Sequence, residues 1–335
     1  MARERLVAVS YPVDDDYAKI NAEVLGEDAT IVSTFGLADE QRAEAIRRAD
    51  ALVTWEVPKE IPPGVLAGTR RPALLQLLSA GVDAVDFAAL PADLLVASNA
   101  GAYAGPMSEY VLAMTLSLAK RLPQHHAALA AGRFDKWVPS QVVNGAICAI
   151  LGFGGIGIAT ARLMKAFGAR IHAVSRTGLA SEPTEFVTTL ADLDQVLASA
   201  DIVVICLPLT LETRGLIGDR ELALMKPNAI LVNVARAAIV DQQALYEHLR
   251  ANPGFRAGID TWWHEPTGDA PFRTDYPFFD LPNVLGSPHN SSIVPGTMLE
   301  GARAAAENVR RYLRGERVTG LVRRADYVGF EITEQ

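Results

Sequence analysis

Apolar and polar positions alternate along the first hundred residues in a repeating order. Short apolar runs with the character of strands are separated by polar stretches such as residues 39–48. The apolar runs are LVAVS, TIVST, ALVTW, LLQLL and LLVAS. Because strands that alternate with helices usually pair in parallel, this pattern predicts a small parallel α/β sheet.

A more continuous apolar segment follows at residues 108–122, with the sequence SEYVLAMTLSLAKRL. Its apolar residues are too continuous for a helix that exposes one face to water, so they favour a helix packed between domains or against a partner. We interpret this segment as the boundary helix between two regions. The polar, irregular residues 132–144 that come after it predict a loop.

A second and clearer alternation begins at Ala146. Helices are expected up to Phe167, with Gly168 as the stop signal, near residues 192–198 and at residues 241–250. The expected strands are AICAILG, ARIHAVS, DIVVICL, AILVNV, FRAGID and NVLGS. This order predicts a doubly wound sheet. A last helical pattern, about residues 295–314, follows the final strand, which would allow the C-terminal segment to cross back and cover the first domain.

The composition is that of a packed globular protein, with half of the residues hydrophobic and 21% charged, and 335 residues fit two domains. The net charge of −8 and the pI near 5.3 disfavour nucleic acid as a partner. No apolar stretch reaches the ~18 residues of a membrane span, and the N-terminal sequence MARERLVAVS lacks the features of an export signal. We expect a cytoplasmic protein that contacts no membrane.

The cysteines and histidines do not indicate a metal centre. Cys148 and Cys206 lie inside apolar runs, which argues against a disulfide framework and against a thiolate metal site. The adjacent His125 and His126 fit a helix surface better than a pair of ligands, and no group of His, Cys and carboxylate residues has convincing metal-site spacing. We therefore expect no bound metal.

A glycine-rich segment joins the first strand and first helix of the second series. It reads Gly152, Phe153, Gly154, Gly155, Ile156, Gly157. This is a G-x-G-x-x-G pattern between a predicted strand and a predicted helix, the position in which it is typical of dinucleotide binding. Gly152 permits a tight turn, Gly154 lets a pyrophosphate approach the backbone, and Gly157 allows close helix packing, while the helix N-terminus offers free N–H groups. A glycine turn without a ligand is the alternative, but the placement favours a dinucleotide cofactor.

The next strand ends in Ser175, Arg176 and Thr177, with no carboxylate to accept hydrogen bonds from the adenosine ribose. Arg176 can pair with a 2′-phosphate through charge-assisted hydrogen bonds, and the small Ser175 leaves room for that group. The sequence thus favours NADPH over NADH. If Arg176 is instead a solvated turn residue, the site accepts either cofactor.

Three candidate catalytic residues each come just after a predicted strand: Arg236, Glu265 and His289. Doubly wound sheets bind ligands outside the carboxyl ends of their strands, so the three are expected to face one crevice. These three residue types match what the reduction of a 2-keto acid requires. Such an acid has a carboxylate to anchor, a carbonyl to polarise and an oxygen that must gain a proton. Arginine suits the first two tasks, histidine suits the third, and a carboxylate beside the imidazole favours its protonated form.

Taken together, these motifs resemble those of the D-isomer-specific 2-hydroxyacid dehydrogenase family, which includes glyoxylate and hydroxypyruvate reductases and phosphoglycerate dehydrogenases. The resemblance spans nearly the whole chain. It is carried by the glycine loop and the three motifs above, and also by residues 78–83, 99–101, 108–109, 206–210 with Thr213, and 258–260.

This resemblance implies an oxidoreductase that moves a hydride between NAD(P)H and carbon 2 of a small 2-keto acid or D-2-hydroxy acid. Arg236 would orient the substrate, Glu265 would support the histidine, and His289 would be the general acid in reduction and the base in oxidation. Ala80 and Gly81 would offer backbone N–H groups to the substrate carboxylate, with Asn99 nearby. Asp260 would hold the nicotinamide carboxamide. The remaining cofactor contacts implied are the glycine loop, Ser175, Arg176, Thr177, Leu207, Pro208, Thr213 and Ala235.

The family architecture implied is a doubly wound Rossmann cofactor domain at residues 101–289 and a smaller flavodoxin-like α/β substrate domain at residues 1–100 and 290–335. Closure of the cleft between the domains would exclude water. The resemblance also implies a homodimer built through the cofactor domain.

The chain departs from the family pattern in places. Ala237 follows the catalytic arginine where many members have glycine, a mild change that affects the turn. Trp262 and Trp263 stand where many members carry smaller residues; they either narrow the substrate pocket or pack between domains, and packing is slightly favoured. Trp55 either borders the substrate or has a packing role, with equal weight.

Two rival functions share this fold. One is a dinucleotide-sensing corepressor, a binding protein against which the acidic, tail-free chain argues. The other is a phosphite or formate dehydrogenase, although the formate enzymes have glutamine where Glu265 stands. Each catalytic candidate also has a structural alternative: a surface ion pair for Arg236, a turn carboxylate for Glu265 and a helix cap for His289. The sequence leaves the particular 2-keto acid open.

Overall fold

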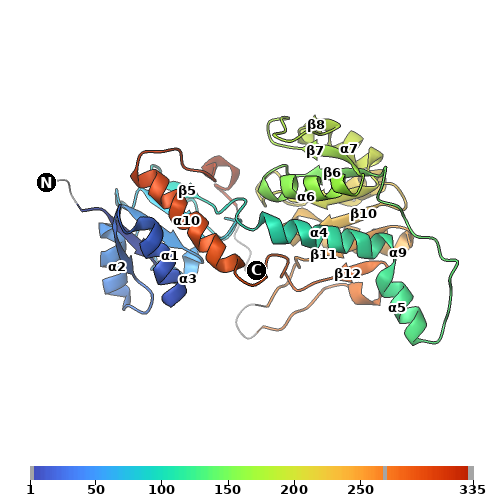
Figure 1. Ribbon diagram of the computed structural model, residues 1–335, viewed down its shortest axis with the longest axis horizontal. Helices are drawn as coiled ribbons and strands as arrows, with labels where there is room; N and C mark the ends of the chain where they lie inside the picture. Colours follow the sequence, from blue (N-terminus) through green and yellow to red (C-terminus); the bar gives the residue numbers. More distant parts are fainter. Residues whose placement is uncertain (1–3, 267–269, 331–335) are drawn as a thin grey trace. The chain divides into compact units, whose positions relative to one another are not determined.

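The computed structural model describes residues 4–266 and 270–330 and divides into two compact units. Unit 1 consists of the described residues up to Tyr103 together with those from Val294 onwards. Unit 2 consists of the described residues from Ala104 to Ile293. The chain therefore leaves unit 1 once and returns to it near its C-terminal end (Figure 1).

Unit 1 is built on a five-stranded parallel sheet with the strand order β2-β1-β3-β4-β5. Its strands are β1 (Leu6–Val9), β2 (Thr30–Ser33), β3 (Ala51–Thr54), β4 (Leu74–Leu77) and β5 (Leu95–Ala97). Its helices are α1 (Asp15–Leu25), α2 (Asp39–Arg48), α3 (Val57–Glu60) and α10 (Thr297–Leu313). All five apolar runs of the first hundred residues are strands, as predicted.

Alternate residues of each strand enter two different cores, one on each face of the sheet. Val7 and Val9 of β1 pack with α1 and α10, whereas Ala8 between them packs with α2. Helix α10 belongs to the first of these cores through Ala302, Ala305, Ala306 and Val309. Small residues along α10 let its backbone come close to the sheet, so the C-terminal helix completes unit 1.

Unit 2 contains a seven-stranded parallel sheet with the order β12-β11-β10-β9-β6-β7-β8. The order reverses between β6 and β9, as in a doubly wound fold. Its strands are β6 (Ile147–Leu151), β7 (Arg170–Val174), β8 (Phe186–Thr188), β9 (Ile202–Ile205), β10 (Ile230–Asn233), β11 (Arg256–Ile259) and β12 (Val284–Gly286). Its helices are α4 (Ala104–Ala119), α5 (Leu122–Ala130), α6 (Gly155–Ala166), α7 (Leu193–Ser199), α8 (Asp219–Leu224) and α9 (Gln242–Ala251). Among the described residues, no helix is long and apolar enough to span a membrane.

The helix expected at residues 108–122 differs from the prediction in its ends. Helix α4 begins at Ala104 and ends at Ala119, and it packs on α6 and the sheet through Val111, Met114 and Leu118 (Figure 1). Its apolar character is thus explained by burial in the core of unit 2. The helix stops because Arg121 adopts the left-handed conformation, with φ of 52°, and Pro123 then starts the separate helix α5.

The short elements are those that the sequence pattern did not reveal. Strand β8 has three residues, α3 four and α8 six, which is too short for either periodicity to be visible. The predicted stop at Gly168 is confirmed, since this residue has a φ of 81° directly after α6.

Candidate active site

The pair His289 and Glu265 is the centre of the site. His289 follows β12 and Glu265 follows the adjacent strand β11. Their side chains meet with 2.7 Å between His289 Nδ1 and Glu265 Oε2, and the imidazole remains partly exposed. The second carboxylate oxygen of Glu265 accepts a hydrogen bond from the backbone N–H of Trp262, at 2.9 Å. The carboxylate is therefore fixed on one side and turned towards the imidazole on the other.

The pKa of the Glu265 carboxyl lies below its ordinary value. Burial by itself raises this pKa, but the hydrogen bond and charge of His289, the Trp262 N–H and the positive charge of Arg236 together outweigh burial. Glu265 is thus an anion at neutral pH. An anion in contact with Nδ1 favours a proton on that nitrogen, which leaves Nε2 to exchange a proton with a reacting group.

Asp260 organises the segment that carries His289. This carboxylate is fully buried and accepts hydrogen bonds from Ser287 Oγ at 2.6 Å, Asn290 N–H at 3.2 Å and Ser291 N–H at 3.2 Å. The backbone oxygen of Asp260 accepts a fourth from the N–H of His289, at 2.8 Å. The His289 loop, which we define as residues 287–291, is therefore bound at four points to one residue at the end of β11.

Arg236 follows β10, the next strand of the sheet, so the three candidate residues come from three neighbouring strands. Asn233 ends that strand and holds the turn: its amide nitrogen donates to the Arg236 carbonyl and its amide oxygen accepts from the N–H of Ala235. After the hydrogen bond and charge of His289 and the Trp262 N–H, the positive charge of Arg236 also helps to lower the pKa of Glu265. Arg236 also donates from Nη1 to the carbonyl of Ala235, at 2.8 Å.

The glycine loop lies at the same carboxyl edge of the sheet, between β6 and α6. A Cβ added at Gly152, which has a φ of 100°, would lie 2.6 Å from the backbone of Cys206, and one at Gly157 would lie 2.1 Å from the oxygen of Gly152. A Cβ at Gly154, by contrast, would meet nothing within 4 Å, and no side chain caps the N-terminus of α6. The loop is thus packed closely on the protein side and open on the other, which fits a pyrophosphate bound to free N–H groups.

Ser175, Arg176 and Thr177 follow β7, beside the glycine loop in the strand order. Arg176 and Thr177 are exposed, while Ser175 donates its hydroxyl to the carbonyl of Leu179 and so shapes the turn. No acidic side chain occurs among these three positions. The turn therefore carries a cation and no carboxylate.

Two further predicted cofactor segments lie at this edge. Leu207 and Pro208 follow β9, and Ala235 follows β10. Thr213 accepts from the N–H of Thr210 and donates its hydroxyl to the Pro208 carbonyl, at 2.6 Å. Thr213 thus folds residues 208–213 into a compact turn.

The predicted substrate residues Ala80, Gly81 and Asn99 belong to unit 1. Ala80 and Gly81 follow β4, and no hydrogen bond among the described residues uses their N–H groups. Asn99 is buried, and its amide nitrogen donates to the carbonyls of Leu78 and Gly301. In this structure Asn99 therefore ties the loop after β4 to helix α10.

Sequence reasoning did not single out Asn233 or Ser287, although both lie within the motifs that it used. For Trp262 and Trp263 the sequence leaves two interpretations, narrowing of the substrate pocket or packing between domains, and it slightly favours packing. Trp262 is 5% exposed and packs with Phe272 and Phe279, while the ring of Trp263 stacks on Phe278. Both rings thus pack in an aromatic cluster within unit 2. The patterns of the sequence carry no sign of these contacts, because they join residues that are 10 to 17 positions apart.

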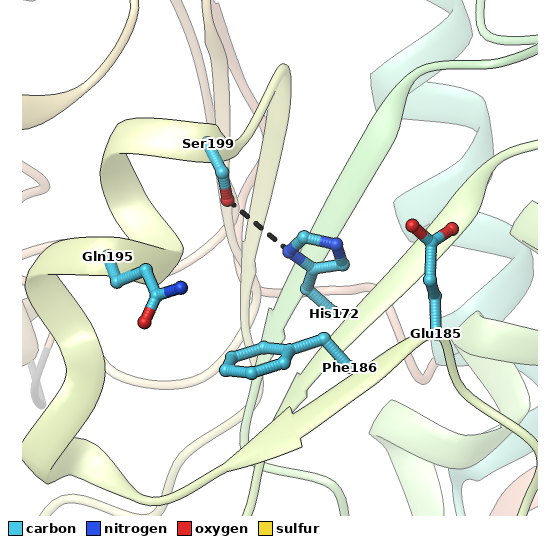
Figure 2. Close-up of a pocket in the computed structure, with 5 residues that line it drawn as sticks. All are labelled: His172, Glu185, Phe186, Gln195 and Ser199. Atoms are coloured by element: carbon cyan, nitrogen blue, oxygen red, sulfur yellow. Dashed lines mark hydrogen bonds between the residues drawn. The ribbon is translucent and has the colours of Figure 1, made fainter.

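A hollow of about 260 Å³ lies at the opposite edge of the same sheet, lined by His172, Glu185, Phe186, Gln195 and Ser199 (Figure 2). Ser199 Oγ is 3.3 Å from Nδ1 of His172, but it also donates to the carbonyl of Val196, and Glu185 is bound by Arg170. Burial lowers the pKa of His172, despite the nearby Glu185. These residues do not form a serine nucleophile with a histidine base and an acid.

The described residues contain no group of three His, Cys, Asp or Glu side chains arranged to hold a metal ion. Of the two cysteines, Cys206 lies beside the glycine loop, and burial raises the pKa of its thiol to about 12. This thiol stays protonated at neutral pH and offers no thiolate for chemistry.

Residues 112–291 match the family model of the D-isomer specific 2-hydroxyacid dehydrogenase, NAD binding domain. Over 282 residues the chain is 33% identical to a glyoxylate reductase of Thermococcus gammatolerans, covering 82% of each protein. It is 31% identical over 320 residues to a D-3-phosphoglycerate dehydrogenase of Methanocaldococcus jannaschii, which covers 94% of this chain but 59% of that relative's length.

A solved structure gives the same relationship. The D-isomer specific 2-hydroxyacid dehydrogenase of Xanthobacter autotrophicus Py2, crystallised with NADPH and MES, superimposes with a TM-score of 0.79 at 27% identity. The match covers 97% of this chain and all of the other. These likenesses agree with the two parallel sheets and the open glycine loop described above. The chain belongs to the D-isomer-specific 2-hydroxyacid dehydrogenase family and has a Rossmann-type domain for a nicotinamide dinucleotide.

Proposed function

We propose that this dehydrogenase reduces small 2-keto acids of the glyoxylate and hydroxypyruvate type to D-2-hydroxy acids, and oxidises them in reverse. One observation carries the proposal: the ionised Glu265 is paired at 2.7 Å with His289, at the same sheet edge as Arg236 and the glycine loop. An imidazole with a fixed anionic partner is suited to give a proton to an oxygen as that oxygen gains charge.

Each residue of the constellation has a distinct task in the proposal. His289 delivers a proton from Nε2 to the carbonyl oxygen during reduction and takes it back during oxidation. Glu265 stabilises the imidazolium and holds the ring by Nδ1. Arg236 binds and orients the substrate through its guanidinium, which polarises the carbonyl as well as pairing with a carboxylate.

The nicotinamide cofactor, when bound, supplies the hydride. The N–H groups at the start of α6 bind its pyrophosphate, and Leu207, Pro208, Thr213 and Ala235 line the path of its remaining parts. We propose that Arg176 and Ser175 favour NADPH, since this exposed turn has a cation in place of an acid. Asp260, besides holding the His289 loop, binds the nicotinamide carboxamide through the remaining lone pairs of its carboxylate.

The substrate carboxylate requires a second set of donors. The N–H groups of Ala80 and Gly81 follow β4 and lack acceptors among the described residues, which suits them to this task. Asn99 shapes that loop through its bonds to Leu78 and Gly301. Trp55 follows β3 in the same unit and is half-buried, so it is a candidate for the residue that limits substrate size.

A kinetic panel tests this function directly. The purified protein is assayed with glyoxylate, hydroxypyruvate, larger 2-keto acids, formate and phosphite, each with the appropriate form of NADP and NAD. We expect reduction of one or more 2-keto acids and no oxidation of formate or phosphite. Dinucleotide binding without turnover of any acid would instead identify a sensor protein.

The role of His289 is tested by the substitution His289→Ala. We expect kcat to fall by ~10²- to 10⁴-fold, the usual contribution of a general acid or base, with dinucleotide affinity unchanged. His172→Ala, on β7 in the hollow that forms no catalytic set, is the matched control. Near-normal turnover of His289→Ala would remove the imidazole from the mechanism.

We also propose that the protein works as a homodimer in the cytoplasm. The segment after α4 exposes large apolar side chains, including Phe134 and Trp137, both 82% exposed. Leu122, Leu129 and Val142 extend this apolar surface along residues 122–142, which we call the α5 arm. Several large exposed apolar side chains in one segment are typical of a protein interface, and a second copy of the chain is the partner that the family relationship suggests.

A further inference from the structure

Trp262 makes two hydrogen bonds that lead to the two catalytic partners. Its backbone N–H donates to Oε1 of Glu265, at 2.9 Å. Its indole Nε1–H donates to the carbonyl of Ser287, the first residue of the His289 loop, at 2.8 Å. One residue is therefore bonded both to the carboxylate that supports His289 and to the segment that carries His289.

The indole ring is held in place by close packing. Trp262 is 5% exposed, and its ring lies 5.1 Å from that of Phe279 and 5.4 Å from that of Phe272, measured between centroids. A Cβ added at Gly286 would lie 2.7 Å from Cζ2 of Trp262 and 3.0 Å from Phe279. Gly286 is the last residue of β12, so the ring rests directly on the backbone that enters the His289 loop.

The anchors made by Asp260 act on a different part of the site. Asp260 accepts its four hydrogen bonds from Ser287, His289, Asn290 and Ser291, all within the His289 loop. Asp260 thus fixes the backbone of the His289 loop, while the two hydrogen bonds of Trp262 connect this loop to Glu265. The distance between Glu265 and His289 depends on both.

We propose that Trp262 is a positioning residue that sets the Glu265–His289 geometry through its indole N–H. The inference rests on the proposed function for its catalytic consequence. Its structural consequence, a more mobile His289 loop when the indole bond is lost, holds whatever the substrate. The large residue that departs from the family pattern is then part of the catalytic apparatus by its contacts, without touching the reacting atoms.

Trp263 provides a matched control in the adjacent position. Its indole Nε1–H donates at 2.9 Å to the carbonyl of Val240, which lies outside the His289 loop, and its ring stacks on Phe278. Trp262→Phe and Trp263→Phe therefore each remove one partly buried indole hydrogen bond and keep an aromatic ring. They differ in which segment loses the hydrogen bond: the His289 loop in Trp262→Phe and the segment at Val240 in Trp263→Phe.

The first experiment compares hydrogen exchange of the two variants with that of the wild type, without cofactor or substrate. We expect Trp262→Phe to speed exchange of the Asn290 and Ser291 amides, and Trp263→Phe to leave it at the wild-type rate. Equal exchange in the two variants would overturn the inference. This measurement stays decisive if the protein reduces none of the acids in the panel.

The second experiment measures kcat, the primary deuterium isotope effect on hydride transfer, the dissociation constant for NADPH and the melting temperature. We expect kcat of Trp262→Phe to be roughly 10- to 100-fold below that of Trp263→Phe, because small displacements of catalytic groups cost this much. The isotope effect should rise, while NADPH affinity and melting temperature match between the variants. Equal kcat values in an enzyme that turns over would refute the positioning role.

Gly286→Ala tests the contact between Trp262 and β12 by changing the residue on which the indole rests. The added methyl group displaces the indole, so this variant should reproduce the low kcat of Trp262→Phe. In the double variant, the smaller phenylalanine ring makes room for the methyl group, and the two losses should not multiply. A double variant with the product of both losses would show that the two residues act separately and would contradict the proposal.

Discussion

At the scale of the residue, His289 is held in a conformation that its own backbone does not favour. Its φ of 51° lies in the left-handed region, which is uncommon for residues other than glycine. The four hydrogen bonds to Asp260 over-determine the loop and maintain this conformation. The backbone thereby presents Nδ1 to Glu265, and rigidity at this point supports the proposed transfer of a proton.

The substitution Glu265→Gln tests the charge at this pair while preserving its shape. The pKa of Glu265 is lowered, so the contribution of its ionised form to stability is present above about pH 4.5, the ordinary value, and is lost as the pH falls through the lowered value. Wild-type activity should therefore show no loss from Glu265 between pH 7 and pH 5. In the variant we expect kcat for reduction to fall roughly 10²-fold at pH 7.

Stopped-flow measurement of reduction at pH 7 gives the readout for Glu265→Gln. A kcat equal to that of the wild type would mean that the charge of the carboxylate is not needed and that the side chain acts by packing alone.

The substitution Arg176→Asp tests cofactor choice at a single exposed residue. An acid at this place repels a 2′-phosphate and accepts hydrogen bonds from ribose hydroxyls, so the ratio of kcat/KM for NADPH to that for NADH should fall by at least 10-fold. Arg317→Asp serves as the charge-matched control, because it makes the same change of charge at an exposed residue of unit 1. An unaltered ratio in Arg176→Asp would assign cofactor preference to other residues.

At the scale of the element, the turn from β6 to α6 separates packing from ligand access within six residues. Gly157 is in contact with the oxygen of Gly152, whereas Gly154 is open on its outer side. Both residues belong to the same G-x-G-x-x-G motif, but each has to be glycine for a different physical reason. Gly157 is needed for the helix to approach the strand, and we propose that Gly154 is needed for a ligand to approach the backbone.

Gly157→Ala and Gly154→Ala should therefore separate stability from binding. The first places a Cβ 2.1 Å from a backbone oxygen, and we expect a loss of ~1–3 kcal/mol in unfolding free energy, the usual cost of overpacking. The second should leave the melting temperature close to that of the wild type and weaken dinucleotide binding. Calorimetry and titration with NADPH measure the two effects. Equal melting temperatures for the two variants would argue against this division of roles.

At the scale of the whole molecule, helix α10 and the α5 arm make different kinds of contact. Helix α10 returns to unit 1, where Arg314 pairs with Asp28 and Arg303 pairs with Glu23. The α5 arm presents its apolar side chains on the surface of unit 2. Helix α10 completes the hydrophobic core of unit 1. We propose that the α5 arm forms an apolar interface between two chains.

The double substitution Phe134→Ser and Trp137→Ser should weaken the proposed homodimer. Removing two large apolar side chains from an interface raises the dissociation constant by more than 10-fold where they are anchors. Analytical ultracentrifugation over a range of concentrations measures this. Phe35→Ser, which removes an exposed aromatic ring from unit 1, is the control and should leave the oligomeric state unaltered. A wild-type protein that remains monomeric at high concentration would rule out the dimer.

The sequence by itself determined the long secondary-structure elements of both units and their order. Short apolar runs and helical patterns are local, so these elements could be predicted, while β8, α3 and α8 were too short to show a pattern. The motifs also identified Arg236, Glu265 and His289 as residues at strand ends, because parallel strands bring their carboxyl ends to one edge.

The tertiary structure alone decided which of these side chains meet and what holds them. The 2.7 Å contact of Glu265 and His289, the Asp260 anchor of the His289 loop and the two bonds of Trp262 join residues 24 to 31 positions apart or sit in turns without periodicity. Such contacts depend on strand order, register and backbone angles, and no local pattern of apolar residues encodes them. For Trp262 the sequence leaves a choice between narrowing the substrate pocket and packing between domains, with packing slightly favoured. The structure places its ring in an aromatic cluster within unit 2 and adds hydrogen bonds to Glu265 and Ser287.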